Sequence, residues 1–569
     1  MKRPVTIAVL FASLILLVWV FAQAPPSSPP DLARLVPAGP ALYIEAKDFG
    51  ALLTDWNGSD EKRLWLTSDN FQVFSRSRLY LKLQQAQTEF AAAAGVPPDL
   101  DLLSNVAGQQ SALAVYDIGK LEFLYITRLS SDRFAGGALW KTRGTYQPRQ
   151  SSGIDYYIKT DPASKRVAAF AAAKDYVVLA TREDVLAGAL ALIAGPSASG
   201  AGSALAGEQW FAKSVHEAKP AGELRMVMDL EKLTRSPHFR SYWIQQNITD
   251  LRQYAAAIAD AGRTSGELHE DRVLLRLAEI APDWNEAAVG EVTRMAPANA
   301  GVYRAWAAPS AQKAFELLRR KILQPRPETQ IVSKTAPVVA LDSGAVGDET
   351  ELEIRIDEPP LETGTPDIGS ELRKLLETVP LAAMLDIGST KVQPDGVFVG
   401  TESGVVLLAA SDWDSSAVRN AITTAMANML TTDQLSVHWL DRGAGANSYF
   451  ELDGLQPLRL AVHGRILAIA SSQELLEAML AGVAGPPATS GARYAAVYRH
   501  SMELPNFVKM MRLIDNPLAK QTTGDAPEPP FFSGNVASLG QTLGRVGSEW
   551  ISVHDTGSIV TQNVVYKLK

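Results

Sequence analysis

The stretch HDTGS, His554 to Ser558, contains the Asp-Thr-Gly sequence of aspartic proteases. Those enzymes need two carboxylates that share a proton, one from each of two lobes. The best second carboxylate is Asp386 in LDIGS, but it lies in the same half of the chain. The first half has only Glu270 and Asp271 at the corresponding place. We therefore interpret HDTGS as a hairpin turn that exposes Asp555 to solvent.

A Ser-x-x-Lys motif, Ser310 to Lys313, has the spacing found in penicillin-interacting enzymes. Those enzymes also need a Ser-Asp-Asn triplet and a Lys-Thr-Gly triplet. Here SDN at 68–70 precedes the serine instead of following it, and the nearest approach to the last motif is KTRG at 141–144. Because Ser310 follows a proline, we expect it to cap a helix.

Other sites for chemistry are poorly supported. The sequence has no nucleophile elbow, phosphate-binding loop or dinucleotide-binding motif in a strand–turn–helix setting. The acidic run from Asp348 to Asp357 alternates charged and apolar side chains, which is typical of a half-exposed strand and not of a calcium loop. None of the seven histidines pairs with another as a local metal ligand. We expect no catalytic residue, no cofactor and no metal site, with an exported hydrolase as the alternative.

Composition excludes several classes of protein. The 569 residues include no cysteine, which removes disulfides, thiolate metal sites and cysteine nucleophiles. The net charge of −8 argues against a nucleic-acid partner, since such proteins need a basic surface to displace counterions. The length suits two large domains or several average ones.

The N-terminus predicts export. Lys2 and Arg3 precede an apolar run from Val5 to Ala22, and the Pro/Ser-rich stretch APPSSPPD follows. We interpret residues 1–24 as a signal anchor or a signal peptide, and residues 25–30 as a stiff spacer. An uncleaved anchor would cross the inner membrane through residues 5–22 and leave the rest of the chain outside the cytoplasm. A cleaved signal would give a periplasmic or secreted protein.

Two similar decapeptides predict a tandem duplication. RLVPAGPALY at 34–43 and RMAPANAGVY at 294–303 share Arg, Pro, Ala and Tyr, and each leads into a strand. Further matches follow in the same order. Strand–turn–strand–helix patterns run over 167–195 and 457–485, with Thr181 and Ser471 as expected helix caps. We expect two repeats at 31–290 and 291–569, in which Tyr43, Ala180 and Phe239 correspond to Tyr303, Ala470 and Phe507.

Short alternating strands joined by tight turns favour an α+β fold with antiparallel sheets and flanking helices. Each repeat would consist of hairpins, with one N-terminal apolar helix in addition. We expect hairpin turns at 117–120 and near 401–404, and helix starts at Ser131–Asp132 and Ser411–Asp412. Each repeat would close with a helix, at 250–262 and 536–545, followed by a hairpin.

The first strand after the export signal resembles the corresponding strand of a known family. Val36-Pro37-Ala38, followed by Tyr43 and preceded by an export signal, resembles a family of exported bacterial proteins classed as a domain of unknown function. The resemblance implies a bacterial envelope protein and assigns no catalytic residues. We therefore expect a membrane-tethered binding or scaffold protein whose partner is an envelope protein or polymer. The alternatives are the exported hydrolase and a ligand carrier with its pocket between the halves.

Overall fold

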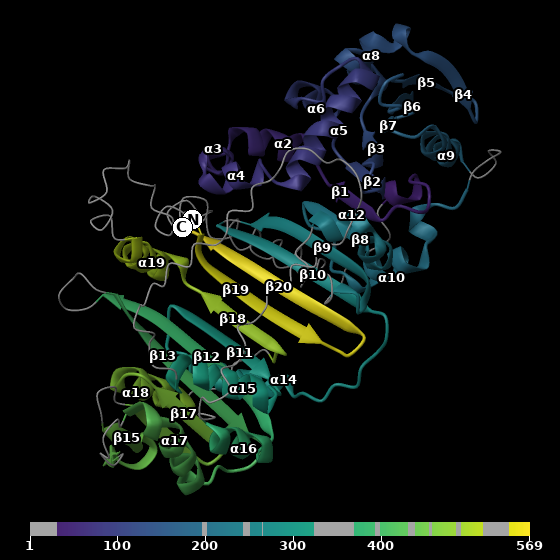
Figure 1. Ribbon diagram of the computed structural model, residues 1–569. Helices are drawn as coiled ribbons and strands as arrows, with labels where there is room; N and C mark the ends of the chain where they lie inside the picture. Colours follow the sequence, from purple (N-terminus) through teal and green to yellow (C-terminus); the bar gives the residue numbers. More distant parts are fainter. Residues whose placement is uncertain are drawn as a thin grey trace, which may run out of the picture. The chain divides into compact units, whose positions relative to one another are not determined.

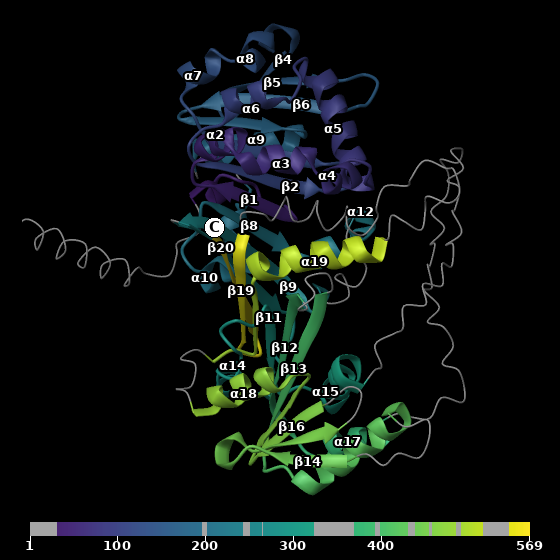
Figure 2. The same ribbon diagram turned by 90° about the vertical axis from the view of Figure 1, so that its left-hand side faces the viewer.

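A computed structural model describes residues 31–195, 202–242, 251–264, 266–323, 369–392, 399–430, 438–453, 458–484, 491–515 and 546–569 (Figures 1 and 2). The expected signal segment, the spacer, the strand within 348–357 and the helix at 536–545 lie outside these residues. Among the helices that are described, none is long and apolar enough to cross a membrane.

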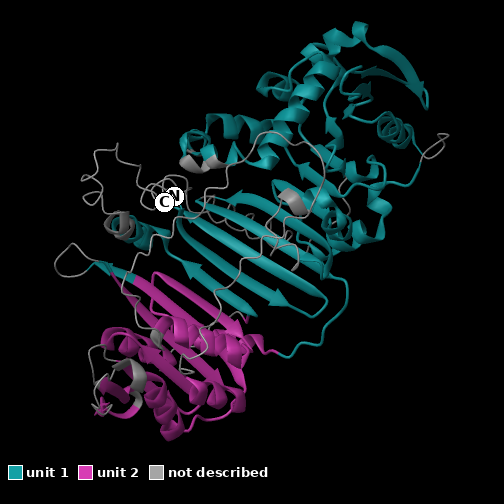
Figure 3. Ribbon diagram, in the orientation of Figure 1, with its two compact units in different colours: residues 1–283, 390–399, 492–569 teal, residues 284–389, 400–491 magenta. Residues whose placement is uncertain are grey.

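The chain divides into two compact units, which Figure 3 shows in different colours. Unit 1 comprises residues 1–283, 390–399 and 492–569, and unit 2 comprises residues 284–389 and 400–491. The units therefore do not follow the boundary expected between the repeats, because residues 492–569 pack with unit 1. The two repeats remain a hypothesis about how the chain arose.

Unit 1 is built on an antiparallel sheet. Its strands lie in the order β4 (Gln147–Ser151), β5 (Ile154–Thr160), β6 (Val167–Ala173), β7 (Tyr176–Ala180), β3 (Glu122–Arg128), β2 (Ser111–Asp117), β1 (Leu42–Ala46), β8 (Leu224–Asp229), β9 (Tyr254–Thr264), β10 (Glu267–Arg276), β20 (Ile559–Leu568), β19 (Val546–Asp555) and β18 (Tyr494–Tyr498). The expected antiparallel α+β fold is thus found.

Helices cover both faces of this sheet. On one face, α9 (Glu183–Ala194) and α10 (Gln209–Glu217) pack on a core that includes Tyr43, Leu124 and Val227. On the other face lie α2 (Phe49–Gly58), α3 (Asp60–Thr67), α4 (Asp69–Phe74), α5 (Arg78–Ala94), α6 (Leu100–Val106), α7 (Ser131–Ala135) and α8 (Ala138–Lys141). The described residues of the unit also form α11 (Leu230–Arg235), α12 (Pro237–Tyr242) and α19 (His500–Asp515).

Unit 2 has a smaller antiparallel arrangement. Strands β14 (His438–Arg442), β15 (Tyr449–Asp453), β16 (Leu458–His463), β17 (Ile466–Ala470) and β13 (Val399–Ala409) pair in that order, and β12 (Leu381–Val392) pairs with β11 (Val302–Ala307). Its helices are α14 (Glu286–Thr293), α15 (Ala311–Leu318), α16 (Ser370–Thr378), α17 (Ser415–Leu430) and α18 (Gln473–Ala481).

Several expected elements are confirmed. The turn at 117–120 joins β2 to β3, and the HDTGS turn joins β19 to β20. Both strand–turn–strand–helix patterns are present, as β6–β7–α9 and as β16–β17–α18. A helix begins at Ser131, as expected, and Ser130 caps it.

Other expected elements are wrong. The helix at 250–262 is largely strand β9, because pairing with both β8 and β10 outweighs the helix propensity of its alanines. Residues 401–404 continue strand β13 and do not turn. Helix α17 begins at Ser415, after the capping side chain of Asp414, and not at 411–412.

Thr181 and Ser471 do not cap helices, because the N-cap positions are Arg182 and Ser472. Each hydroxyl instead accepts a hydrogen bond from a neighbouring strand. Thr181 Oγ1 binds the amide of Phe123, and Ser471 Oγ binds the amide of Ser403, both at 2.9 Å. The two residues therefore play the same part in different units.

Candidate functional site

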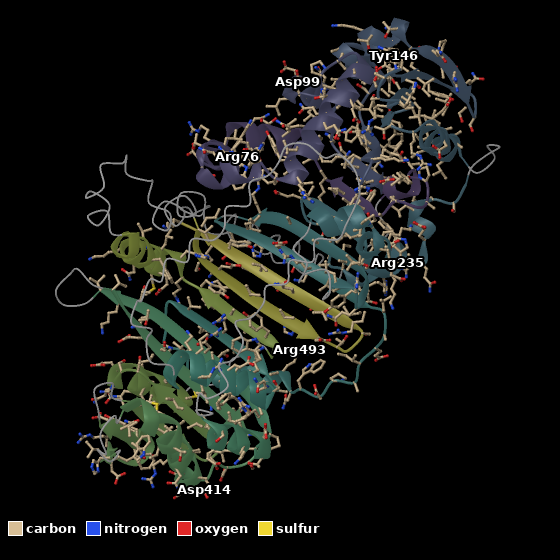
Figure 4. The ribbon with its side chains drawn as sticks, in the orientation of Figure 1. Arg76, Asp99, Tyr146, Arg235, Asp414 and Arg493 are labelled. Atoms are coloured by element: carbon tan, nitrogen blue, oxygen red, sulfur yellow. The ribbon has the colours of Figure 1, made fainter. Side chains whose placement is uncertain are left out.

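The Asp-Thr-Gly carboxylate does not lie in a protease site. Asp555 is buried, which corrects the expectation of an exposed turn, because Arg276 and Arg493 both pair with it. Figure 4 labels Arg493. Arg276 Nη2 lies 2.6 Å from Asp555 Oδ2, and the amide of Gly557 binds Oδ1 at 2.9 Å. Asp386 is likewise paired with a guanidinium, that of Arg304. Two carboxylates occupied by arginines are not arranged to share a proton.

Ser310 caps helix α15, as expected. Its Oγ accepts a hydrogen bond from the backbone amide of Lys313 at 3.2 Å. The ammonium group of Lys313 lies 4.4 Å from the centre of the Trp306 ring. Ser68 bridges α3 and α4 and belongs to unit 1, whereas Ser310 belongs to unit 2. These residues therefore have structural roles.

Unit 1 contains a cavity of about 680 Å³ between the sheet and its helices. This volume lies within the range of about 300–1,000 Å³ that is usual for small-molecule sites. The lining residues are mostly aliphatic or aromatic: Ile44, Ala46, Phe49, Leu83, Ala86, Gln87, Phe90, Pro98, Leu102, Leu103, Val106, Ser111, Ala112, Leu113, Val115, Leu121, Phe123, Tyr125, Leu179 and Leu224.

The floor of the cavity follows from strand alternation. Successive side chains of a strand point to opposite faces, so Tyr43 enters the α9–α10 core while Ile44 faces the cavity. In β3, Leu124 enters the same core while Phe123 and Tyr125 face the cavity. Strands β1, β2 and β3 thus have one closely packed face and one face that borders open space.

The roof consists of α2, α5 and α6. The C-terminal part of α5 is packed, since Ala93 and Ala94 are buried in the core beneath α7 and α8. By contrast, α2 has no buried residue although Phe49 lines the cavity. A separate cluster of four aromatic rings, with centroids 5.4 to 6.5 Å apart, joins the adjoining helices α3, α4 and α5: Trp65, Phe71, Phe74 and Tyr80.

We call residues 49–74, which form α2, α3 and α4, the flap. Its first turn is attached to the sheet layer by two backbone hydrogen bonds, from Phe49 to the carbonyl of Gln109 and from Gly50 to the carbonyl of Gly108. Trp56 on α2 and Leu66 on α3 are each 45% exposed. Because α2 has no buried residue, this first helix of the flap opens more readily than a packed core, whereas the aromatic cluster joins α3 and α4 to α5.

One end of the cavity is polar but uncharged. Tyr125 Oη lies 2.9 Å from the carbonyl of Val106 and 3.2 Å from Ser111 Oγ, which in turn lies 2.7 Å from Thr127 Oγ1. Burial raises the pKa of Tyr125, so its phenol stays protonated and donates a hydrogen bond. Among the described residues that line the cavity, none carries a charge.

The corresponding strands of unit 2 carry a charged pair at the matching place. Ile44, next to Tyr43, stands opposite Leu113, and both line the cavity. In unit 2, the residue next to Tyr303 is Arg304, which stands opposite Asp386 and forms an ion pair of 2.6 Å with it.

Helices α15 and α16 pack directly on this part of unit 2. Phe315, Leu318, Leu372 and Leu376 are all buried there, together with Met384 and Val405 of the strands. Trp306, three residues after Tyr303, packs against the same core, whereas Ala46, three residues after Tyr43, borders the cavity.

No group of three or more acidic or histidine side chains that could hold a metal ion occurs among the residues that were placed. Sequence reasoning missed the cavity, because its lining residues have the spacing of ordinary core residues. The signal that could have found it is the smaller size of Ala46 and Ser111 relative to Trp306 and Met384 in the matching strands.

No family model matches the chain, and no curated protein matches it. Among solved structures, it is similar to crystal forms IV and I of TP0453, with 10% and 11% sequence identity and TM-scores of 0.23 and 0.22. The similarity to form IV covers 45% of this chain and 81% of that chain. The similarity to form I covers 46% and 82%. TM-scores this low carry no argument about fold or function.

Proposed function

We propose that the protein is an extracytoplasmic carrier that binds the apolar chain of a lipid-like ligand in the cavity of unit 1. The observation that carries this proposal is a cavity of about 680 Å³ lined by apolar side chains and by no charged one among the described residues. Burying an apolar chain there is favourable by about 0.8 kcal/mol per methylene group. An isolated charge would be strongly disfavoured in the same place.

This proposal favours the carrier over the scaffold protein and the hydrolase that the sequence left open. The site lies within unit 1. Catalysis would need a nucleophile beside a base, whereas the polar side chains that line the cavity are those of Gln87, Ser111 and Tyr125, and the last two bind each other. The tether through residues 5–22 and the envelope location remain part of the proposal on the strength of the sequence.

We also propose that the chain arose by duplication. The pairings β4–β5–β6–β7–β3 of unit 1 have the same order as β14–β15–β16–β17–β13 of unit 2. The pair β1–β2 matches β11–β12, and β8–β9–β10 matches β18–β19–β20. Thr181 and Ser471 make matching hydrogen bonds, which supports the same correspondence.

The pairing of β10 with β20 supports duplication further. Asp271 is the fifth residue of β10 and Asn563 is the fifth residue of β20, and the two stand opposite each other. In an isologous, twofold interface, equivalent residues face each other in this way. An experimental structure in which Tyr43, Ala180 and Phe239 fail to superpose on Tyr303, Ala470 and Phe507 would refute the duplication.

A fluorescence titration tests the carrier function. N-phenyl-1-naphthylamine is an uncharged apolar dye that brightens in an apolar site, and we expect the full chain to bind it. Ala46→Trp places in the cavity the side chain that unit 2 carries as Trp306, and should weaken dye binding at least about tenfold. Ala92→Trp adds the same ring to the exposed side of α5 and serves as the matched control.

The expected result is dye binding by the natural chain and by Ala92→Trp, with little binding by Ala46→Trp. Equal binding by all three proteins would place the dye elsewhere. No binding by the natural chain would reject an open apolar cavity.

A further inference from the structure

The uncharged lining of the cavity restricts which part of a ligand enters it. An apolar chain fits, but a charged head group buried there would have no charged partner among the described lining residues. The head of an amphiphilic ligand must therefore stay at the mouth. The large apolar lining residues that remain exposed are Leu83, at 44%, and Leu224, at 39%.

Leu224 marks one edge of the cavity, where the strands end. It stands opposite Ala46, which also lines the cavity. Just beyond this pair, the amide of Lys47 binds the carbonyl of Glu223 at 3.0 Å. The apolar lining thus changes within one residue to a charged edge.

Arg263, near the end of β9, lies at this charged edge. Its Nε is 3.1 Å from Glu223 Oε2, and its Nη2 is 3.0 Å from Asp55 Oδ2 on α2. The side chain is 46% exposed, and those of Glu223 and Asp55 are 42% and 57% exposed. The guanidinium is oriented to bind carboxylates, and it is accessible from solvent, so a carboxylate of a ligand can reach it.

The other ion pair of the roof is built differently. Arg166 binds Glu89 of α5 at 2.7 Å and the carbonyl of Lys120 at 2.6 Å, and its side chain is only 9% exposed. This arginine holds α5 to the sheet and has little exposed surface for a ligand. Arg263 combines exposure with a partner on the flap.

We propose that Arg263 recognises the anionic head of a single-chain amphiphile whose chain fills the cavity. The head replaces Asp55 as a partner of the guanidinium, which releases α2 from the sheet edge. The ligand class is therefore a chain with a carboxylate or a similar anionic head. This inference rests on the proposed carrier function and adds the specificity of its mouth.

Competition against the dye tests the inference with the full chain. Dodecanoate and dodecan-1-ol have the same chain length and differ in head charge. We expect the natural protein to bind dodecanoate about tenfold more tightly, and Arg263→Gln to bind the two ligands equally. Asp55→Asn removes the carboxylate that competes for Arg263, so it should strengthen dodecanoate binding and leave dodecanol unchanged.

Arg235→Gln is the matched charge control, because this arginine is exposed on α11 and pairs with Glu231 of the same helix (Figure 4). It should keep the preference for dodecanoate. The inference is overturned if Arg263→Gln keeps that preference, or if it weakens both ligands alike, which would make Arg263 a purely structural link. An unchanged preference in Asp55→Asn also contradicts the exchange of partners. Dye binding without any head-group preference would overturn this inference alone, whereas absence of dye binding would overturn the carrier function too.

Discussion

Strands β1 and β2 of unit 1 pair like β11 and β12 of unit 2, but the two pairs are covered differently by helices. In unit 2, α15 and α16 lie directly on the strands, and Phe315, Leu372 and Leu376 are buried. In unit 1, α2, α5 and α6 stand off β1, β2 and β3 and leave the cavity. Close packing lowers the free energy of a fold, so an unfilled apolar space costs stability unless something occupies it. In the proposed carrier, the chain of the ligand would fill this space and replace the packing that α15 and α16 provide in unit 2.

The largest expected effect contrasts a phenylalanine of each unit. Phe315→Ala removes a fully buried ring and should lower the free energy of unfolding by about 3–5 kcal/mol. Phe49→Ala removes a half-buried ring that borders open space, and should cost about 1 kcal/mol or less, because few contacts are lost. Urea unfolding of the full chain, followed by circular dichroism, measures both. Similar losses for the two variants would break the comparison.

The next effect concerns the ion pair between Arg304 and Asp386 in unit 2, which stands where unit 1 has Ile44 and Leu113. Asp386→Asn leaves Arg304 and Lys321 without their carboxylate, and should cost about 2 kcal/mol, since Arg304 is partly exposed. Replacing both partners by those of unit 1, as Arg304→Ile with Asp386→Leu, should cost less than Asp386→Asn alone. The double variant leaves only Lys321 without its carboxylate, whereas Asp386→Asn leaves both Arg304 and Lys321 uncompensated.

Thermal unfolding of these two proteins checks the expectation. If the double variant is clearly less stable than Asp386→Asn, the two strand pairs are not interchangeable. The correspondence between Ile44–Leu113 and Arg304–Asp386 would then lose its support.

The smallest effect concerns helix α5, which the ion pair between Arg166 and Glu89 holds to the sheet. The hydrogen bond from Arg166 lowers the pKa of Glu89 below its usual value. A carboxylate with a lowered pKa in the folded state stabilises the fold above its unfolded pKa of about 4.3, and this contribution is lost as the pH falls through the folded pKa. Glu89→Gln should therefore be less stable than the natural chain at pH 7, with a difference that shrinks below about pH 4.

Melting temperatures of the two proteins at pH 7 and pH 3 test this sign. A difference that grows on acidification would show that the pair does not stabilise α5 as its geometry implies.

The sequence predicted the hairpins well because their signals are local. Alternating side chains and turn residues fix β2–β3, β6–β7 and β19–β20 within short stretches. It failed at β9, whose alanine-rich residues favour a helix in isolation and become a strand only through β8 and β10. Local patterns cannot report such partners.

The candidate site was harder to predict for a related reason. Leu83, Phe90 and Leu102 would have the same spacing whether their helices packed on the sheet or stood away from it. The burial of Asp555 was missed because its two arginine partners are 279 and 62 residues away in sequence. Comparison of the two expected repeats, Ala46 against Trp306, was the one signal present in the chain itself.

Hydrogen exchange of the full chain, with and without dodecanoate, tests the central claim most directly. Without ligand, the amides of α2 should exchange faster than those of α15 and α16, because α2 has no buried residue. With ligand, exchange in α5 and α6, which line the cavity, should slow, while exchange in α15 and α16 should not change. Protection confined to α15 and α16, or equal exchange of α5 and α6 with and without dodecanoate, would contradict a ligand site in the cavity of unit 1.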